Sequence, residues 1–133
     1  MKNLKDISSL EDIKLMIDTF YESATQDSTI GFIFQNHMSK SMEEHKPKIY
    51  NFWNSILFSK GNYKGNPIKT HINLDQRVQL LPLHFQTWIE LWEATIDGLF
   101  EGPKANEVKE KAGLMKTLMM VKLNDSRNPN FIQ

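Results

Sequence analysis

The sequence predicts an all-α fold, and three observations support this. Apolar residues recur every three or four positions along most of the chain, which is the spacing of one helix face. Glycine and proline lie mainly between these stretches and so mark their ends. No stretch alternates apolar and polar residues as a half-buried strand would, and no internal repeat is present. The 133 residues suit one domain, expected over 1–123, with a flexible tail over 124–133.

The first expected helix follows Ser8, because Ser8 and Glu11 have the spacing of a capping box. Its apolar face contains Ile13, Met16, Ile17, Phe20, Tyr21 and Ala24. The polar stretch 26–28 interrupts the pattern, and a short apolar segment follows at 30–34.

A second helical stripe contains Met42, His45, Ile49, Phe52, Trp53, Ile56 and Leu57. Pro47 is expected in or near its first turn, where a missing N–H costs least, since a later position would imply a kink. Glycines and a proline then predict a loop over 59–67. Asn66 as the N-cap and Pro67 as the first helical residue start a short helix with His71 on its apolar face.

Pro82 opens a third long stripe, and Gly102 with Pro103 ends it. The apolar residues of this stripe are Phe85, Trp88, Trp92, Thr95, Ile96 and Leu99. The last expected helix carries Ala105, Val108, Ala112, Met115, Leu118 and Met119 on its inner face.

Charge and composition argue against several classes of protein. Sixteen Lys and Arg balance sixteen Asp and Glu, so no basic surplus indicates a nucleic-acid or anionic-membrane binder. The absence of cysteine excludes disulfides, thiolate metal sites and cysteine nucleophiles. The longest uncharged stretch, 49–59, is shorter than the roughly 20 residues of a membrane-spanning helix, and the N-terminus has no apolar signal core. We expect a cytoplasmic monomer.

Four residues with polar tips lie on the apolar stripes: Tyr21, His45, His71 and Trp88. A buried polar group without a partner costs about 1–3 kcal/mol, so four of them in a small helical domain indicate a common partner. Each residue alone is also compatible with ordinary core packing, in which its polar tip bonds to nearby backbone. A helical domain without a cofactor therefore remains an alternative.

Several chemistries lack their motif in this chain. It has no H-E-x-x-H zinc motif, no Glu-x-x-His pair of a di-iron bundle, no glycine-rich phosphate loop and no G-x-S-x-G elbow. Spacing alone does not exclude a Ser-His-Asp site. Haem fits the remaining pattern, because it needs an apolar slot, one neutral histidine on its iron and polar donors on the other side. Such donors stabilise bound O₂, which acquires partial negative charge.

The same residues resemble the group III truncated haemoglobins, from about Ile13 to Leu118. The strongest block is His45-Lys46-Pro47-Lys48-Ile49-Tyr50-Asn51-Phe52-Trp53, followed by Gly61-Asn62-Tyr63-Lys64-Gly65-Asn66-Pro67 and then His71. Phe20-Tyr21, Ile33-Phe34 and His84-Phe85-x-x-Trp88 add separate matches. Two features depart from the family pattern: the segment 31–34 has Phe where the family often has Pro, and the stretch 74–82 is a few residues longer.

The resemblance implies a two-over-two globin sandwich around haem b. It implies that His71 is the proximal iron ligand and that Tyr21 and Trp88 donate hydrogen bonds on the distal side, with His45 as a gate or third polar partner. The residues implied to contact haem are Phe34, Ile49, Phe52 and Trp53 as its walls and Lys48 as a propionate partner. The function implied is binding of O₂, and also of CO or NO. The alternative is an enzyme for NO dioxygenation or peroxide reduction, which would need a separate reductase because the chain shows no flavin or nicotinamide site.

Overall fold

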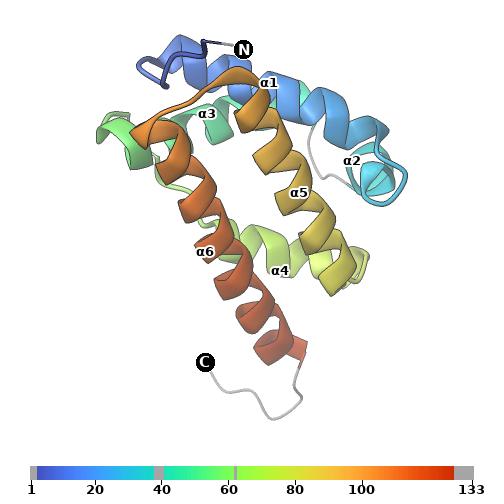
Figure 1. Cartoon of the computed structure of the whole chain (residues 1–133). Coiled ribbons are helices and arrows are strands. Elements are labelled where there is room, and N and C mark those ends of the chain that lie inside the picture. Colours follow the sequence, from blue (N-terminus) through green and yellow to red (C-terminus); the bar gives the residue numbers. More distant parts are fainter. Residues whose placement is uncertain (1–2, 38–40, 62, 128–133) are drawn as a thin grey trace.

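The computed structural model describes residues 3–37, 41–61 and 63–127 (Figure 1). Over these ranges the chain forms helices and no strand, which confirms the all-α prediction. The helices are α1 (Leu10–Gln26), α2 (Gly31–Asn36), α3 (Met42–Phe58), α4 (Pro67–Arg77), α5 (Pro82–Leu99) and α6 (Pro103–Arg127). None of the helices in the described part is both long and apolar enough to cross a membrane.

The core is built around Trp92 of α5, which is 2% exposed. Helix α1 packs against α2, α3 and α5, while α6 packs against α3, α4 and α5. The indole N–H of Trp92 donates to the Val108 carbonyl of α6 at 3.3 Å. Its ring stacks with Trp53 of α3 at 5.2 Å and with Trp88 one turn earlier at 6.0 Å. All three tryptophans of the chain therefore form one stack that links α3 to α5.

Helix α1 begins one residue later than its sequence predicts. The N-cap is Ser9, whose hydroxyl accepts from the Asp12 N–H at 3.2 Å. The Asp12 carboxylate in turn accepts from the Ser8 N–H at 2.9 Å. The expected pair of Ser8 and Glu11 was therefore wrong by one position, because Asp12 and not Glu11 reaches back over the end of the helix.

Pro47 lies deeper in α3 than expected. The helix begins at Met42, after the N-cap Ser41, so Pro47 occupies the second turn and not the first. Without an N–H it cannot donate the helical hydrogen bond to the Glu43 carbonyl. The start of α4 is as predicted: Asn66 caps it by accepting from the Lys69 N–H at 3.1 Å, and Pro67 is its first residue.

Helix α2 is held closely against the end of α1, and a glycine makes this approach possible. A Cβ placed on Gly31 would lie 2.8 Å from the Thr25 carbonyl oxygen, which is too close for any other residue. The Gln35 side chain donates to the same carbonyl at 2.6 Å. This packing places the half-buried Phe34 beside α1.

Helix α6 extends past residue 123, where the sequence predicted the start of a tail. Leu123 is 1% exposed and anchors the last turns in the core. Arg127 then donates to the Asp75 carboxylate at 2.8 Å and to the Leu80 carbonyl at 2.7 Å. The hydrogen bonds from Arg127 hold the pKa of Asp75 below its usual range. Residues 124–127 are thus helical, and the rest of the expected tail lies outside the described residues.

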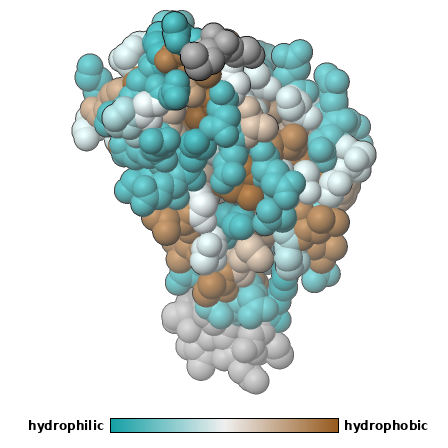
Figure 2. Space-filling model, viewed as in Figure 1, coloured by the Kyte–Doolittle hydropathy of each residue, from teal (hydrophilic) through white to brown (hydrophobic). Residues whose placement is uncertain are grey.

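The outer face of α6 carries apolar residues, and one of them was predicted to lie on the inner face. Leu118, expected on the inner stripe, is 48% exposed, and Leu114 and Val121 are exposed beside it. Figure 2 shows a largely hydrophilic surface on which such apolar patches are separated by polar residues. Single exposed apolar side chains are common on soluble domains.

Asp6 caps α6 although it lies almost the whole chain away in sequence. Its carboxylate accepts from the N–H groups of Lys104 and Ala105, each at 2.9 Å. Gly102 leaves room for this carboxylate, because a Cβ there would lie 2.5 Å from the Asp6 Cγ. Burial alone would raise the pKa of Asp6, but the backbone hydrogen bonds outweigh it and lower the pKa. The first residues of the chain therefore stabilise its last helix.

Replacing Asp6 with alanine is expected to lower the free energy of unfolding by about 1–2 kcal/mol at pH 7, the cost of losing a helix cap. Because the pKa of Asp6 is lower in the folded state, this stabilisation is present above about pH 4 and is lost as the pH falls through the folded-state pKa. Urea unfolding at a series of pH values measures the effect. Glu101→Ala, an exposed control beside the cap, should change stability by less than about 0.5 kcal/mol. Equal losses in the two variants would contradict the capping role.

Candidate functional site

Tyr21 and His45 meet between α1 and α3. The Tyr21 hydroxyl lies 3.5 Å from the His45 Nε2, and Tyr21 is only 8% exposed. Its ring packs edge-on against Phe20 at 5.2 Å and against Phe34 of α2 at 5.5 Å. These contacts fix the direction of the Tyr21 hydroxyl. Tyr21 and His45, which the sequence placed on two separate helical stripes, thus bring their polar groups together among apolar side chains.

Both members of this pair are neutral at pH 7. Burial raises the pKa of the Tyr21 hydroxyl above its usual range, so it keeps its proton and can donate. Burial also lowers the pKa of His45, and the neighbouring His71 and Lys48 lower it further, because a charged His45 would be repelled by Lys48 and by any protonated His71. The two imidazoles come from α3 and α4, and His71 is close enough to contribute to the lowered pKa of His45.

His71 of α4 has one ring nitrogen fixed by the backbone. Its Nδ1 lies 2.7 Å from the Pro67 carbonyl oxygen. A carbonyl can only accept, so Nδ1 carries the hydrogen and Nε2 carries the lone pair. Burial lowers the pKa of His71, while the hydrogen bond to Pro67 opposes this shift. His71 therefore offers a neutral, oriented imidazole with an unshared electron pair on Nε2, which is the form that binds a metal.

The face of α4 that carries His71 is apolar but incompletely covered. Ile68, Ile72 and Leu74 contact the core, yet no residue of α4 is fully buried. Among the described helices, α4 approaches only α6. Figure 1 shows α4 crossing behind α5 and α6. An amphipathic helix normally buries its apolar face against the core. The half-exposed apolar face of α4 therefore indicates that an apolar ligand packs against it.

Trp88 of α5 is linked to Tyr21 through Phe20, whose ring contacts both residues. It is half-buried, stacks on Trp92 and packs edge-on against Phe20 at 6.3 Å. Its N–H donates to no other residue in the described part of the chain. In the described part of the chain, every buried side-chain nitrogen or oxygen has a hydrogen-bond partner. Because the Trp88 N–H has none, it is not buried but accessible. It is available to a ligand.

The predicted wall residues divide into two groups. Phe34, Ile49 and Phe52 are half-buried and pack against the edge of the core. Trp53 is 3% exposed and stacked on Trp92, so the structure places it in the core behind this surface. Lys48 is exposed on α3, near enough to His45 to affect its pKa.

Two contributors were not predicted from the sequence. The Pro67 carbonyl sets the tautomer of His71, and its position four residues earlier in the same helix could have indicated this. Phe20 contacts Tyr21, Trp88 and Trp92 and so holds both donor residues in place. The described residues contain no group of three or more His, Asp or Glu side chains that could enclose a metal ion by themselves.

Comparison with known proteins finds one family. The chain is 32% identical over 108 residues to the group 3 truncated hemoglobin of Campylobacter jejuni subsp. jejuni, a match that covers 79% of this chain and 83% of that protein. Its fold is similar to the crystal structure of the group III truncated hemoglobin from Campylobacter jejuni, with a TM-score of 0.80, 28% sequence identity, and coverage of 90% of this chain and 94% of that one. No protein-family model matches the sequence.

Proposed function

Because this chain belongs to the group III truncated haemoglobin family, a family of haem-binding globins, we propose that it binds O₂ with His71 as the proximal ligand of the iron. Tyr21, His45 and Trp88 then form the polar distal side. The observation that carries the proposal is the hydrogen bond from His71 Nδ1–H to the Pro67 carbonyl, because it leaves a neutral Nε2 as a metal ligand.

The residues around His71 suit a flat apolar cofactor. The half-buried faces of Ile68 and Ile72 on α4 and of Ile49 and Phe52 on α3 would contact the porphyrin, with Phe34 at the distal side. Trp53 would support Phe52 from behind, since the two rings pack at 5.3 Å. Lys48 would pair with a propionate. With no cysteine in the chain, the thioether bonds of a covalently attached haem are not possible, which favours haem b.

Haem, when bound, would supply an iron with one open position for O₂, CO or NO. The chain's own contribution is to hold two donors near that position. Tyr21 keeps its proton because burial raises its pKa, and Trp88 has an accessible N–H. A hydrogen bond to a partly charged acceptor stabilises it by about 1.5–3 kcal/mol, so two donors would favour the bound gas by about two to four orders of magnitude over an apolar pocket. Such retention fits sensing, scavenging or redox chemistry better than delivery.

The second candidate function is NO dioxygenation or peroxide reduction at the same site. It is favoured by His45, a neutral imidazole 3.5 Å from the Tyr21 hydroxyl, which could pass a proton to peroxide. No flavin or nicotinamide motif is present in the sequence, so turnover would need an electron donor from outside the chain. Steady-state consumption of peroxide or NO, measured with an added reductant, tests this function. Rates no greater than those of free haemin would exclude this enzymatic function and leave gas binding as the only proposed function.

Haemin titration of the apoprotein tests the main proposal. We expect one haemin per chain, an intense Soret band, and quenching of tryptophan fluorescence, because all three tryptophans lie in the stack beside the site. After reduction the spectrum should change on adding O₂ and return under argon. Failure to form a Soret complex would assign His45 and His71 to core packing and leave a globin fold without its cofactor.

A further inference from the structure

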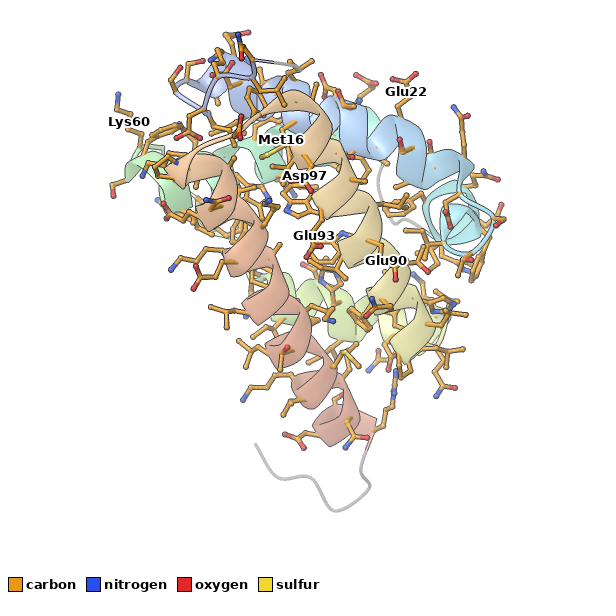
Figure 3. The ribbon with its side chains drawn as sticks, viewed as in Figure 1. Met16, Glu22, Lys60, Glu90, Glu93 and Asp97 are labelled. Atoms are coloured by element: carbon orange, nitrogen blue, oxygen red, sulfur yellow. The ribbon has the colours of Figure 1, made fainter. Side chains whose placement is uncertain are left out.

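The formal charge of zero conceals an uneven distribution along the chain. Residues 45–74, which contain most of the proposed haem contacts, include five lysines and no acidic residue. Helix α5 is the reverse, with Glu90, Glu93 and Asp97 and no lysine or arginine. Figure 3 shows these three acidic residues along α5, with Lys60 apart from them at the end of α3. The segment that carries His71 is therefore basic, whereas helix α5 is acidic.

Three of the five lysines lack an acidic partner among the described residues. Lys46 is paired with Asp18 of α1 at 3.5 Å. Lys60, Lys64 and Lys69 are exposed, and no described carboxylate lies within 4.0 Å of their ammonium groups. Lys104 adds a further cation at the end of α3, where it donates to the Leu57 carbonyl at 2.8 Å and pairs with Glu107 at 3.3 Å.

Two of the unpaired lysines, Lys64 and Lys69, adjoin residues of the proposed haem site, while Lys60 lies just beyond the end of α3. Lys69 is in the first turn of α4, two residues before His71. Lys64 follows Tyr63, whose ring packs at 5.1 Å against the wall residue Phe52. Two ionised propionates would add about two negative charges, fewer than the four lysines of this segment other than Lys46, which is paired with Asp18. The basic character would therefore persist in the haem-loaded protein.

We propose that Lys60, Lys64 and Lys69 form the docking surface for an acidic electron-carrier protein. The inference rests on the proposed haem function, and it names the partner class that this function needs. Docking would bring the carrier beside the α4 side of the site, where one electron passes from the reduced carrier to the ferric protein. The carrier is oxidised by one electron and the globin becomes ferrous.

Charge complementarity favours this occupant over a nucleic acid. Binding of a nucleic acid needs a basic surplus for the whole domain and many phosphate contacts, whereas this surface offers three unpaired lysines on a protein of zero net charge. Transient redox complexes use small interfaces and long-range charge attraction. Such attraction raises association rates by about 10- to 1,000-fold and weakens as salt increases.

The test uses the haem-loaded protein and a reduced plant-type ferredoxin as the acidic probe. The double variant Lys64→Glu with Lys69→Glu is compared with the charge-matched control Lys111→Glu with Lys122→Glu on α6, where both lysines are exposed. Lys69→Glu should not weaken α4, because an acidic residue is favourable in a first turn. At about 50 mM salt we expect the test variant to be reduced at least tenfold more slowly and the control less than threefold. At about 500 mM salt the difference should disappear.

A second measurement does not depend on electron transfer. Titration calorimetry at low salt measures the affinity of oxidised ferredoxin for the oxidised globin. This affinity should fall at least tenfold in the test variant and stay unchanged in the control. Photoreduced riboflavin, a small reductant that needs no docking surface, should reduce all variants at nearly equal rates. Equal behaviour of the two double variants toward ferredoxin, with normal Soret bands in both, would overturn the docking surface alone. Absence of a Soret band in the unaltered protein would instead overturn the proposed function.

Discussion

Replacing His71 with glycine is expected to weaken haem binding by at least about a hundredfold. Loss of a residue that only orients a metal ligand costs about 10- to 100-fold, so loss of the ligand itself should cost at least the upper value. The structure gives no substitute on α4, since none of its other described side chains offers an imidazole or thiolate. Competition for haemin with apomyoglobin, followed at the Soret band, measures the affinity.

Imidazole separates loss of the ligand from loss of the fold. Added imidazole should enter the space left in His71→Gly and restore the Soret band in proportion to its concentration. His37→Gly is the matched control, because His37 lies at the end of α2 and takes no part in the site; it should bind haemin as the unaltered protein does. A His71→Gly protein that binds haemin with unchanged affinity would refute the assignment of the proximal ligand.

Removal of the distal donors is expected to speed O₂ release. Tyr21→Phe removes a hydroxyl that burial keeps protonated, and Trp88→Phe removes an accessible indole N–H. Each loss of a hydrogen bond of about 1.5–3 kcal/mol should raise the O₂ dissociation rate at least several-fold, with about tenfold as the central expectation. Stopped-flow displacement of O₂ by CO measures this rate.

Tyr50→Phe controls for the general effect of removing a tyrosine hydroxyl. Tyr50 is on α3 but donates to Asp18 of α1, outside the site. Its substitution should leave O₂ release within about twofold of the unaltered protein. In the double variant of Tyr21 and Trp88, the two effects should multiply if the donors act independently, and a departure from multiplication is expected if both reach the same ligand. Unchanged release in both single variants would remove the claim that either residue is a distal donor.

The sequence predicted those features of the fold that depend on local chemistry. Asn66 and Pro67 start α4 as expected, since side-chain capping and a missing N–H act within one turn. The end of α6 could not be predicted in this way. It depends on Arg127 reaching Asp75 and Leu80, which are close only in the folded chain. The capping of α6 by Asp6 is a contact of the same kind.

The candidate site shows the same division. Helical spacing placed Tyr21, His45, His71 and Trp88 on inner faces, and the structure brings Tyr21 and His45 into contact. Spacing could not show that Trp53 lies in the core while its neighbour Phe52 stays half-exposed, because that depends on the stacking of Trp53 on Trp92. Nor could it show the His71 tautomer, which a single backbone carbonyl determines.

The coordination of iron by the His71 Nε2 is the central claim, and resonance Raman spectroscopy of the ferrous, gas-free protein tests it most directly. We expect an iron–histidine stretching band in the unaltered protein. In His71→Gly with imidazole, a shifted band from the exogenous ligand should replace it. An unchanged iron–histidine band in the variant would show that another residue, such as His45, holds the iron, and would contradict the arrangement of proximal and distal sides proposed here.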